Sequence, residues 1–363
     1  MNSDQHFMQM ALDLAALGAG HTSPNPMVGA VVVKDGQVVG KGYHQRAGGP
    51  HAEVLALDEA GDRAMGATLY VTLEPCNHHG RTPPCTERIL AAGIHRVVAA
   101  LSDPNPTVAG GGNARLRSAG VLVDEGLLAD AAARLNETWI KYIRTGLPFV
   151  VLKCAATLDG CIATRSGDAR WVTGPTARER VHRLRSQLDA ILVGVGTVIA
   201  DNPQLTARLP DGSGRDPLRI VLDARLETPP ESRLFGLDSP AKTLIVCAEA
   251  ASPERRRRLE AAGARMLTSP LDRGRIDLKA LMTRLGAMQV TSVLIEGGAR
   301  VAAAVLAEKI VDKIMFFYAP KILGGQGLPI CQGPGPQRMA EAMAVRNMEI
   351  TRVGDDFLVT GDL

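Results

Sequence analysis

The first part of the chain combines a helical hydrophobic pattern with short extended stretches. Between residues 4 and 17, apolar side chains recur three or four positions apart, which predicts an amphipathic helix. Two apolar stretches then flank the dipeptide Asp35-Gly36, a turn signal that predicts a β-hairpin. Beyond it, the pattern predicts helices at 51–59 and 86–92, strands at 68–73 and 96–101, and two helices ending near Tyr142. This order predicts a layered α/β domain.

The pattern breaks at residues 144–148, where Gly146 and Pro148 predict a linker between domains 1–146 and 147–363. The second domain is again predicted to be α/β, with a strand-rich end. Its expected strands are 149–155, 190–193, 219–222, 243–247, 292–295, 313–318 and 357–360, and its expected helices are 177–187, 253–262, 277–285 and 300–307. The longest irregular stretch is 205–216, and loops of this length often carry functional residues.

Composition narrows the class of partner. The net charge of +3 suits small anions as well as nucleic acid, but an aromatic content of 3% argues against a protein that stacks bases. The six cysteines are dispersed, which argues against a disulfide framework. No apolar run approaches the roughly 20 residues of a membrane span, and the N-terminus lacks the pattern of a signal peptide. We expect a cytoplasmic protein with a small-molecule partner, no nucleic acid and no membrane; a homo-oligomer is left open.

A catalytic zinc site is predicted by His51-Ala52-Glu53, Pro75-Cys76 and Cys85. Imidazole and thiolate are preferred zinc ligands, and three of them leave a fourth position for water. Zinc lowers the pKa of a water bound at that position towards neutral values. We predict that Glu53 carries a proton from this water to a leaving amine. Cys85 precedes a predicted helix, whose dipole favours the thiolate. The pattern matches zinc nucleobase deaminases, which have the order His-x-Glu, Pro-Cys, Cys.

Two other interpretations of these residues stay open. Cys76 and Cys85 could be buried small hydrophobic residues beside a surface histidine. A structural zinc would need a fourth ligand, for which His78 and His79 are the nearby candidates. Eight residues separate the two cysteines, whereas the deaminase pattern has two. Arg81 in this insertion could bind a phosphate, or it could be a solvated charge on a loop.

Two glycine-rich segments of the second domain follow predicted strands. Gly194-Val195-Gly196-Thr197 permits close approach of a ligand to backbone N–H groups, or is simply a tight turn. A dinucleotide fingerprint fits it poorly, because the third glycine position holds Ile199. Glu296-Gly297-Gly298-Ala299 opens an alanine-rich helix, and such a helix start suits a phosphate.

Several longer motifs resemble the family of bifunctional riboflavin-biosynthesis deaminase/reductases, and the resemblance extends over nearly the whole chain. They include Ser23-Pro24-Asn25-Pro26-Met27-Val28-Gly29, the segment from Pro75 to Cys85, Leu152 to Gly160, Ala200 to Thr206, and Ile295-Glu296-Gly297-Gly298. The resemblance implies a cytidine-deaminase-like three-layer first domain and a dihydrofolate-reductase-like second domain. It implies one zinc per chain, and NADPH as the second cofactor.

The resemblance also implies residue roles. In the first domain it assigns substrate binding to Asn25, His44, His78 and Arg81, although Asn25 could simply be a turn residue. In the second it implies catalytic roles for Lys153 and Asp201, which could polarise or protonate the reduced oxygen. Substrate contacts are implied for Arg185, Leu205, Arg208 and Glu296, and cofactor contacts for Ala155, Trp171, Thr197, Asp201, Gly297 and Gly298. Arg185 could instead lie on a solvated helix face, and Trp171 could be a core residue.

The implied substrate is a 2,5-diaminopyrimidinone with a 5-phosphoribosylamino group, deaminated first and then reduced at the ribosyl group. The chain departs from the family at Asn77 and Ala169, where small hydroxyl residues are usual, and at Cys161, where lysine is common. We expect the change at Asn77 to be tolerated, and Ala169 to weaken the reductase through one lost hydrogen bond. The alternatives are a nucleoside or RNA-base deaminase with a non-catalytic nucleotide-binding second domain, and a zinc-stabilised binding module.

Overall fold

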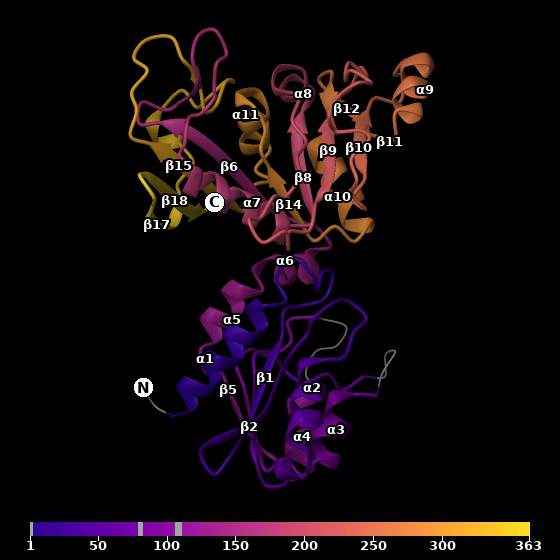
Figure 1. The fold of residues 1–363 in the computed structure, drawn as a ribbon, viewed down its shortest axis with the longest axis vertical. Helices are drawn as coiled ribbons and strands as arrows, with labels where there is room; N and C mark the ends of the chain where they lie inside the picture. Colours follow the sequence, from indigo (N-terminus) through magenta and orange to yellow (C-terminus); the bar gives the residue numbers. More distant parts are fainter. Residues whose placement is uncertain (1–2, 79–82, 106–110) are drawn as a thin grey trace. The chain divides into compact units, whose positions relative to one another are not determined.

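The computed structural model describes residues 3–78, 83–105 and 111–363. The chain divides into two compact units, Met1–Gly146 and Leu147–Leu363 (Figure 1). Among the described residues, no helix has the length and apolar character needed to cross a membrane.

A five-stranded sheet in the order β2-β1-β3-β4-β5 forms the middle of the first unit. Its strands are β1 (Gly29–Lys34), β2 (Gln37–Tyr43), β3 (Thr68–Val71), β4 (Arg96–Ala99) and β5 (Leu122–Glu125). β1 and β2 form the predicted hairpin, and its turn residues Asp35 and Gly36 both have positive φ, as a tight two-residue turn requires. β3, β4 and β5 run parallel, so their carboxyl ends lie at one edge of the sheet.

Helices cover both faces of this sheet, because its buried strands carry apolar side chains on both sides. Val31 and Val33 pack with the α1 side, whereas Ala30 and Val32 pack with the α2 side. The helices are α1 (Ser3–Ala16), α2 (Ala52–Ala60), α3 (Cys85–Ala91), α4 (Gly112–Ser118), α5 (Ala129–Leu135) and α6 (Glu137–Thr145), with a 3₁₀ turn at Gly61–Ala64. The hydrophobic pattern did not predict α4 or β5. The edge strand β5 is largely exposed, so it lacks the alternation that marks a half-buried strand.

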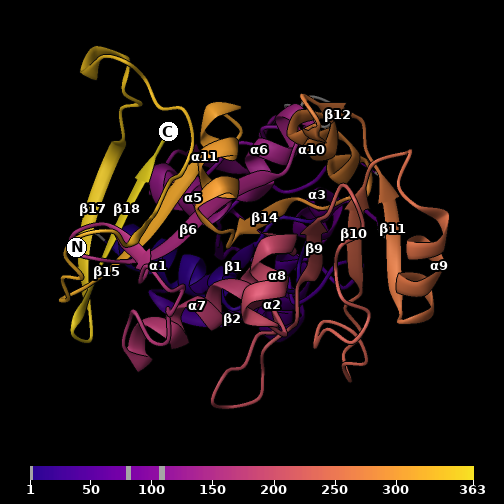
Figure 2. The ribbon, with the colours of Figure 1, turned by 90° about the horizontal axis from the view of Figure 1, so that it is seen from above.

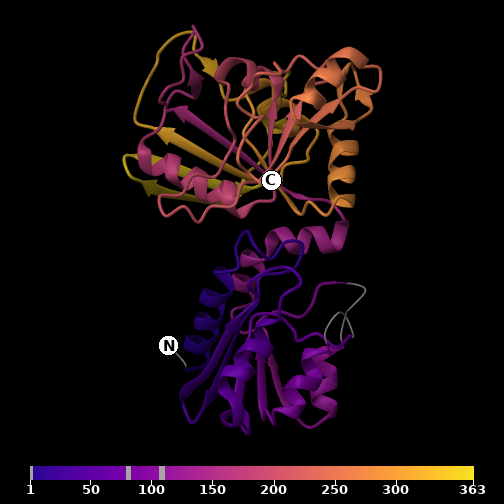
Figure 3. The ribbon, with the colours of Figure 1, turned by 45° about the vertical axis from the view of Figure 1, so that its right-hand side comes forward.

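The second unit contains a nine-stranded sheet in the order β11-β10-β9-β8-β14-β6-β15-β18-β17. The strands are β6 (Phe149–Thr157), β8 (Ala190–Gly194), β9 (Leu218–Leu222), β10 (Thr243–Cys247), β11 (Ala264–Thr268), β14 (Ser292–Ile295), β15 (Lys313–Ala319), β17 (Arg346–Val353) and β18 (Asp356–Asp362). Strands β11 through β15 in this order are parallel, and they run side by side in Figure 3. β18 and β17 extend the sheet antiparallel, which confirms the strand-rich end.

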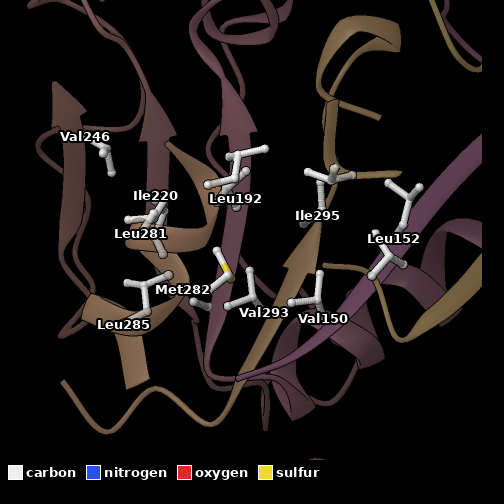
Figure 4. Packing of buried hydrophobic residues seen from close by; sticks show 14 of the residues in the cluster. Val150, Leu152, Leu192, Ile220, Val246, Leu281, Met282, Leu285, Val293 and Ile295 are labelled. Carbon is white, nitrogen blue, oxygen red and sulfur yellow. The ribbon is translucent and has the colours of Figure 1, made fainter. Parts of the chain in front are cut away.

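Helices lie on both faces of the larger sheet, with α10 and α11 on one side and α7 and α8 on the other (Figure 2). They are α7 (Pro175–Gln187), α8 (Val195–Asp201), α9 (Pro253–Ala261), α10 (Leu278–Ala287) and α11 (Ala299–Ala307), with a 3₁₀ turn at Met339–Glu341. Short two-stranded ladders join β7 (Cys161–Ala163) to β16 (Leu328–Pro329) and β12 (Leu271–Asp272) to β13 (Arg275–Ile276). Figure 4 shows the core beneath α10, where Leu281, Met282 and Leu285 pack on strand residues such as Leu192 and Val293.

Candidate active sites

Three potential metal ligands meet at the carboxyl edge of the smaller sheet. His51 is the residue just before α2, Cys76 lies in the loop after β3, and Cys85 begins α3. Their ligand atoms all lie within 4.8 Å of one another. His51 Nδ1 is 3.2 Å from Cys85 Sγ and 3.5 Å from Cys76 Sγ. The Cys85 backbone N–H donates to Cys76 Sγ at 3.3 Å.

The chemistry of this cluster fits zinc. One imidazole and two thiols converge on one point, which is the donor set of a catalytic zinc with an open fourth position. The hydrogen bond from Cys85, followed by the interaction with His51, lowers the pKa of Cys76 to about 4. In the coupled pair, the hydrogen bond to Cys76 and burial raise the pKa of Cys85. Cys76 is therefore the first of the two to become a thiolate.

Glu53 lies in the first turn of α2 and is 3% exposed. Burial raises the pKa of its carboxyl group. Within residues 3–78, 83–105 and 111–363, the group of converging ligand atoms does not include Glu53. It is thus a buried acid two residues from His51, with a raised affinity for a proton, as a group that takes up and releases a proton requires.

Asn25 and His44 interact directly beside the ligand cluster. Asn25 Nδ2 is 3.1 Å from His44 Nε2, and His44 Nδ1 is 3.0 Å from the Pro50 carbonyl oxygen. The carbonyl can only accept, so Nδ1 carries the proton and Nε2 accepts from Asn25. His44 packs edge-on against His51, with ring centroids 5.7 Å apart. The buried His44 thereby orients Asn25 near the cluster.

The segment between the two cysteines is only partly described. His78 is exposed just after Cys76, whereas Arg81 and His79 lie outside the described residues. Asn77 accepts a hydrogen bond from Thr86 Oγ1 at 2.8 Å.

Glu74 and Asp103 lie close to the ligand cluster in the sequence or at the same sheet edge, and the sequence pattern predicted no role for either. The buried Glu74 carboxylate accepts backbone N–H groups from Asp103 at 3.1 Å, Gly112 at 3.0 Å and Asn113 at 2.9 Å. A Cβ on Gly112 would lie 1.9 Å from the Pro75 carbonyl oxygen, so only glycine fits there. Burial, and then the charge of Glu74, raise the pKa of Asp103. An acid after β4 could have been noticed, because ligands bind at the carboxyl edge of parallel strands.

Lys153, Arg185 and Glu296 form a buried charge cluster in the second unit. Arg185 Nε donates to Glu296 Oε1 at 2.6 Å and Nη2 donates to Oε2 at 3.0 Å, while Lys153 Nζ lies 3.3 Å from Oε2. Burial opposes ionisation of Glu296, but the two cations outweigh it and lower its pKa to about 2. The alternative that Arg185 lies on a solvated helix face is wrong, because its side chain is only 14% exposed.

The irregular stretch after α8 brings further predicted residues to this cluster. Arg185 Nη1 donates to the Thr206 carbonyl at 3.2 Å, and Arg208 Nη1 donates to Thr206 Oγ1 at 2.7 Å. The Leu205 side chain is 3% exposed and packs in an apolar cluster. Asp201 ends α8 and is exposed. In the described parts of the chain, no hydrogen bond or ion pair joins Asp201 to Lys153 or Glu296.

The predicted cofactor residues lie near the carboxyl ends of the parallel strands. Gly298 is the residue before α11, and a Cβ there would lie 3.6 Å from Thr197 Oγ1, so α8 and α11 begin close together. A Cβ on Gly297 would lie 2.6 Å from Val301 Cβ, which explains the glycine. The segment containing Thr197 is the helix α8, so its interpretation as a tight turn is wrong.

Trp171 and Ala155 are the remaining residues that are predicted to contact the cofactor. The alternative that Trp171 is a core residue is wrong, because it is 64% exposed. Arg178 stacks over its ring at 4.7 Å from the centroid, and Lys321 Nζ donates to its carbonyl oxygen at 2.7 Å. Ala155 lies on β6, two residues from Lys153.

Known proteins match both units. The model described as the cytidine and deoxycytidylate deaminase zinc-binding region matches residues 1–101, and that of the RibD C-terminal domain matches 148–359. The riboflavin biosynthesis protein RibD of Escherichia coli (strain K12) is 44% identical, with 97% of this chain and 97% of that protein covered. Its counterpart in Aquifex aeolicus is 43% identical, with 98% and 97% covered. The chain belongs to the RibD family.

Solved structures of RibD family members have the same fold. Acinetobacter baumannii RibD, form 1, matches with a TM-score of 0.89 at 38% identity, covering 99% of this chain and 98% of that one. A relative from Thermotoga maritima, a diaminohydroxyphosphoribosylaminopyrimidine deaminase/5-amino-6-(5-phosphoribosylamino)uracil reductase, matches with a TM-score of 0.83 at 38% identity, covering 99% of this chain and 98% of that one. The predicted cytidine-deaminase-like and dihydrofolate-reductase-like domains are confirmed. As a RibD family member, this chain joins a zinc-binding pyrimidine deaminase to a ribosyl reductase that uses NAD(P)H.

Two departures from the RibD family pattern lie in the reductase. Ala169 is half-buried, and its carbonyl accepts the N–H of Val172 at 3.1 Å. Cys161 is buried on β7 beside Gly327, where a Cβ would lie 2.5 Å from its Sγ. Neither residue is among those that form the Lys153, Arg185 and Glu296 cluster.

Proposed function

We propose that residues 1–146 deaminate 2,5-diamino-6-(5-phosphoribosylamino)pyrimidin-4-one, and that residues 147–363 then reduce its ribosyl group with NADPH. The partner is thus a small phosphoribosyl pyrimidine. The observation that carries the deaminase half is the meeting of His51, Cys76 and Cys85 within 4.8 Å, beside the buried Glu53. The reductase half is supported by the cationic cluster around Glu296, which suits a phosphorylated sugar.

The deaminase step exchanges one C–N bond for one C–O bond. Zinc held by His51, Cys76 and Cys85 supplies Lewis-acid activation of water at neutral pH. Glu53 takes the proton of the attacking water and passes it to the departing amine, which leaves as ammonia. Burial raises the pKa of Glu53 and so fits it for both roles. Asn25, oriented by His44, binds the pyrimidine by hydrogen bonding.

The reductase step opens the ribose ring. NADPH supplies the hydride that C1′ receives. As the bond from C1′ to the ring oxygen breaks, that oxygen needs a proton, which Lys153 or Asp201 supplies. Lys153 is the buried candidate, held by Glu296 at 3.3 Å, and Asp201 is the exposed one. The helix start at Gly298 and the neighbouring Thr197 bind the cofactor.

The test follows ammonia release and NADPH oxidation together, with the zinc-loaded full chain and the diaminopyrimidinone substrate. We expect ammonia first and NADPH loss second. Ammonia without NADPH loss would remove the reductase assignment. Absence of both signals, with ammonia released from cytidine or a tRNA stem-loop instead, would favour the alternative deaminase.

A further inference from the structure

His182 faces the charge cluster from the same side of α7 as Arg185. The two residues are three positions apart, so their side chains lie on one helix face. Both reach the same acceptor: His182 Nδ1 is 3.2 Å from the Thr206 carbonyl oxygen, and Arg185 Nη1 also donates to it at 3.2 Å. His182 therefore connects α7 to the irregular stretch that carries Arg208.

His182 Nδ1 lies 3.2 Å from both the Thr206 carbonyl oxygen and the backbone nitrogen of Arg208. The carbonyl can only accept and the backbone N–H can only donate, so one tautomer does not satisfy both contacts. In the tautomer with Nδ1 protonated, Nδ1 donates to the Thr206 carbonyl. The other nitrogen, Nε2, lies 3.3 Å from Arg208 Nη2 and accepts from it. A protonated imidazole would have no lone pair for Arg208. The neutral ring is also favoured because burial, and then the charges of Arg185 and Arg208, lower the pKa of His182 to about 4.

The two arginines differ in how many guanidinium N–H groups are already used in hydrogen bonds. Arg185 uses Nε and Nη2 on Glu296 and Nη1 on Thr206, and its side chain is buried. Arg208 is exposed, and its Nη1 donates to Thr206 Oγ1 at 2.7 Å and to Gln204 Oε1 at 3.5 Å. Among the described residues, its Nε–H and one Nη2–H have no partner. Arg208 is thus the cation that can donate to an incoming phosphate.

We propose that His182 is a positioning residue that holds the Arg208 guanidinium for the phosphate group of the ribosyl substrate. The proposal rests on the reductase function above. The imidazole holds Nη2 of Arg208 from one side while Thr206 Oγ1 holds Nη1. A guanidinium fixed in this way loses less side-chain entropy when it binds a phosphate.

Two substitutions separate the contact of His182 with the Arg208 guanidinium from its contacts with the backbone. In His182→Gln, the longer side chain places an amide oxygen near the position of Nε2 and keeps an acceptor for the guanidinium. In His182→Asn, the shorter amide stays beside the Thr206 carbonyl and the Arg208 backbone but does not reach the guanidinium. We expect His182→Asn to raise the reductase KM for the phosphoribosyl substrate about tenfold, with kcat little changed, and His182→Gln to restore most of the loss.

The matched control is Arg183→Gln, which removes an exposed cation on the same helix that pairs with Glu179. It should leave KM unchanged. The KM for NADPH, and the kcat/KM for the dephosphorylated substrate, should not change in either His182 variant. An unchanged KM in His182→Asn, or an equal loss for phosphorylated and dephosphorylated substrates, would overturn the proposal. A raised KM for NADPH would instead place Arg208 at the cofactor.

A binding measurement distinguishes failure of this proposal from failure of the proposed function. Calorimetry with ribose 5-phosphate needs no turnover. We expect the full-length wild type and Arg183→Gln to bind it alike, and His182→Asn about tenfold more weakly. Binding that is equal in all three proteins would overturn the role of His182, even if the wild type reduces its substrate. Thermal melting of each variant excludes a folding defect as the cause.

Discussion

The guanidinium of Arg185 donates two hydrogen bonds to the carboxylate of Glu296, at 2.6 and 3.0 Å. This fork is the strongest geometry for an arginine and a carboxylate. With Lys153 on the same carboxylate, two buried cations face one anion, so positive charge remains for a phosphorylated ligand. Glu296 therefore organises the two cations of this cluster.

Removing the charge of Glu296 should destabilise the second unit. Glu296→Gln leaves Arg185 and Lys153 without their anion, and breaking a buried pair in this way costs about 3–5 kcal/mol. Calorimetric unfolding of the full chain measures the loss. The control is Glu341→Gln, which breaks an exposed pair with Arg338 worth about 0–1 kcal/mol. Equal stability of the two variants would show that the cluster contributes little to folding.

Glu53→Gln should abolish deamination and leave the metal in place. Loss of the proton shuttle lowers the rate of ammonia release about 10²- to 10⁴-fold. Zinc content and reduction of the deaminated intermediate should stay at wild-type values. Glu59→Gln on the same helix is the control, because this carboxylate is exposed and accepts the backbone N–H of Lys41. A Glu53→Gln protein that has lost its zinc would instead identify Glu53 as a ligand.

Removal of zinc should abolish the deaminase activity and leave the reductase activity intact. After chelation, we expect ammonia release to stop while NADPH oxidation with the deaminated intermediate continues. Cys85→Ser should lower the zinc content below one ion per chain, because a hydroxyl is a poor replacement for thiolate. Cys331→Ser, at an exposed cysteine, is the control. Parallel loss of both activities on chelation would contradict separate sites.

His182 should make the stability of the folded chain depend on pH. Its pKa is lowered to about 4 in the folded chain, from 6.5. Between these values the unfolded chain binds the additional proton, so the free energy of unfolding falls as pH falls from about 6.5 towards about 4. Above pH 6.5 this contribution is complete. Urea midpoints at pH 7.5 and 5 should therefore differ less in His182→Gln than in the wild type; an identical difference would contradict the shift.

Ala169→Ser should strengthen substrate binding by the reductase. The hydroxyl restores the hydrogen bond that the family pattern implies, worth about 0.5–1.5 kcal/mol. We expect a KM for the phosphoribosyl substrate that is roughly two- to tenfold lower. The KM for NADPH is the internal control. An unchanged substrate KM would show that this position makes no contact.

The sequence predicted what depends on residue type at short range. The hairpin follows from Asp35-Gly36, and the zinc site follows from the spacing of one histidine and two cysteines, which are preferred zinc ligands. The helix α8 was missed, because Gly196 within it lowers local helix propensity. The contacts of Glu74 and His182 could not be predicted, because each joins segments more than 20 residues apart. The partners of such side chains are set by tertiary packing.

The carboxylate of Glu74, two residues before Cys76, accepts three backbone N–H groups. Pro75 in turn packs against Gly112 so closely that no larger residue fits there. The backbone just before the cysteine is thus held in place. Substitutions at Glu74 or Gly112 could therefore change inhibitor resistance or substrate preference, although neither residue is a predicted ligand contact.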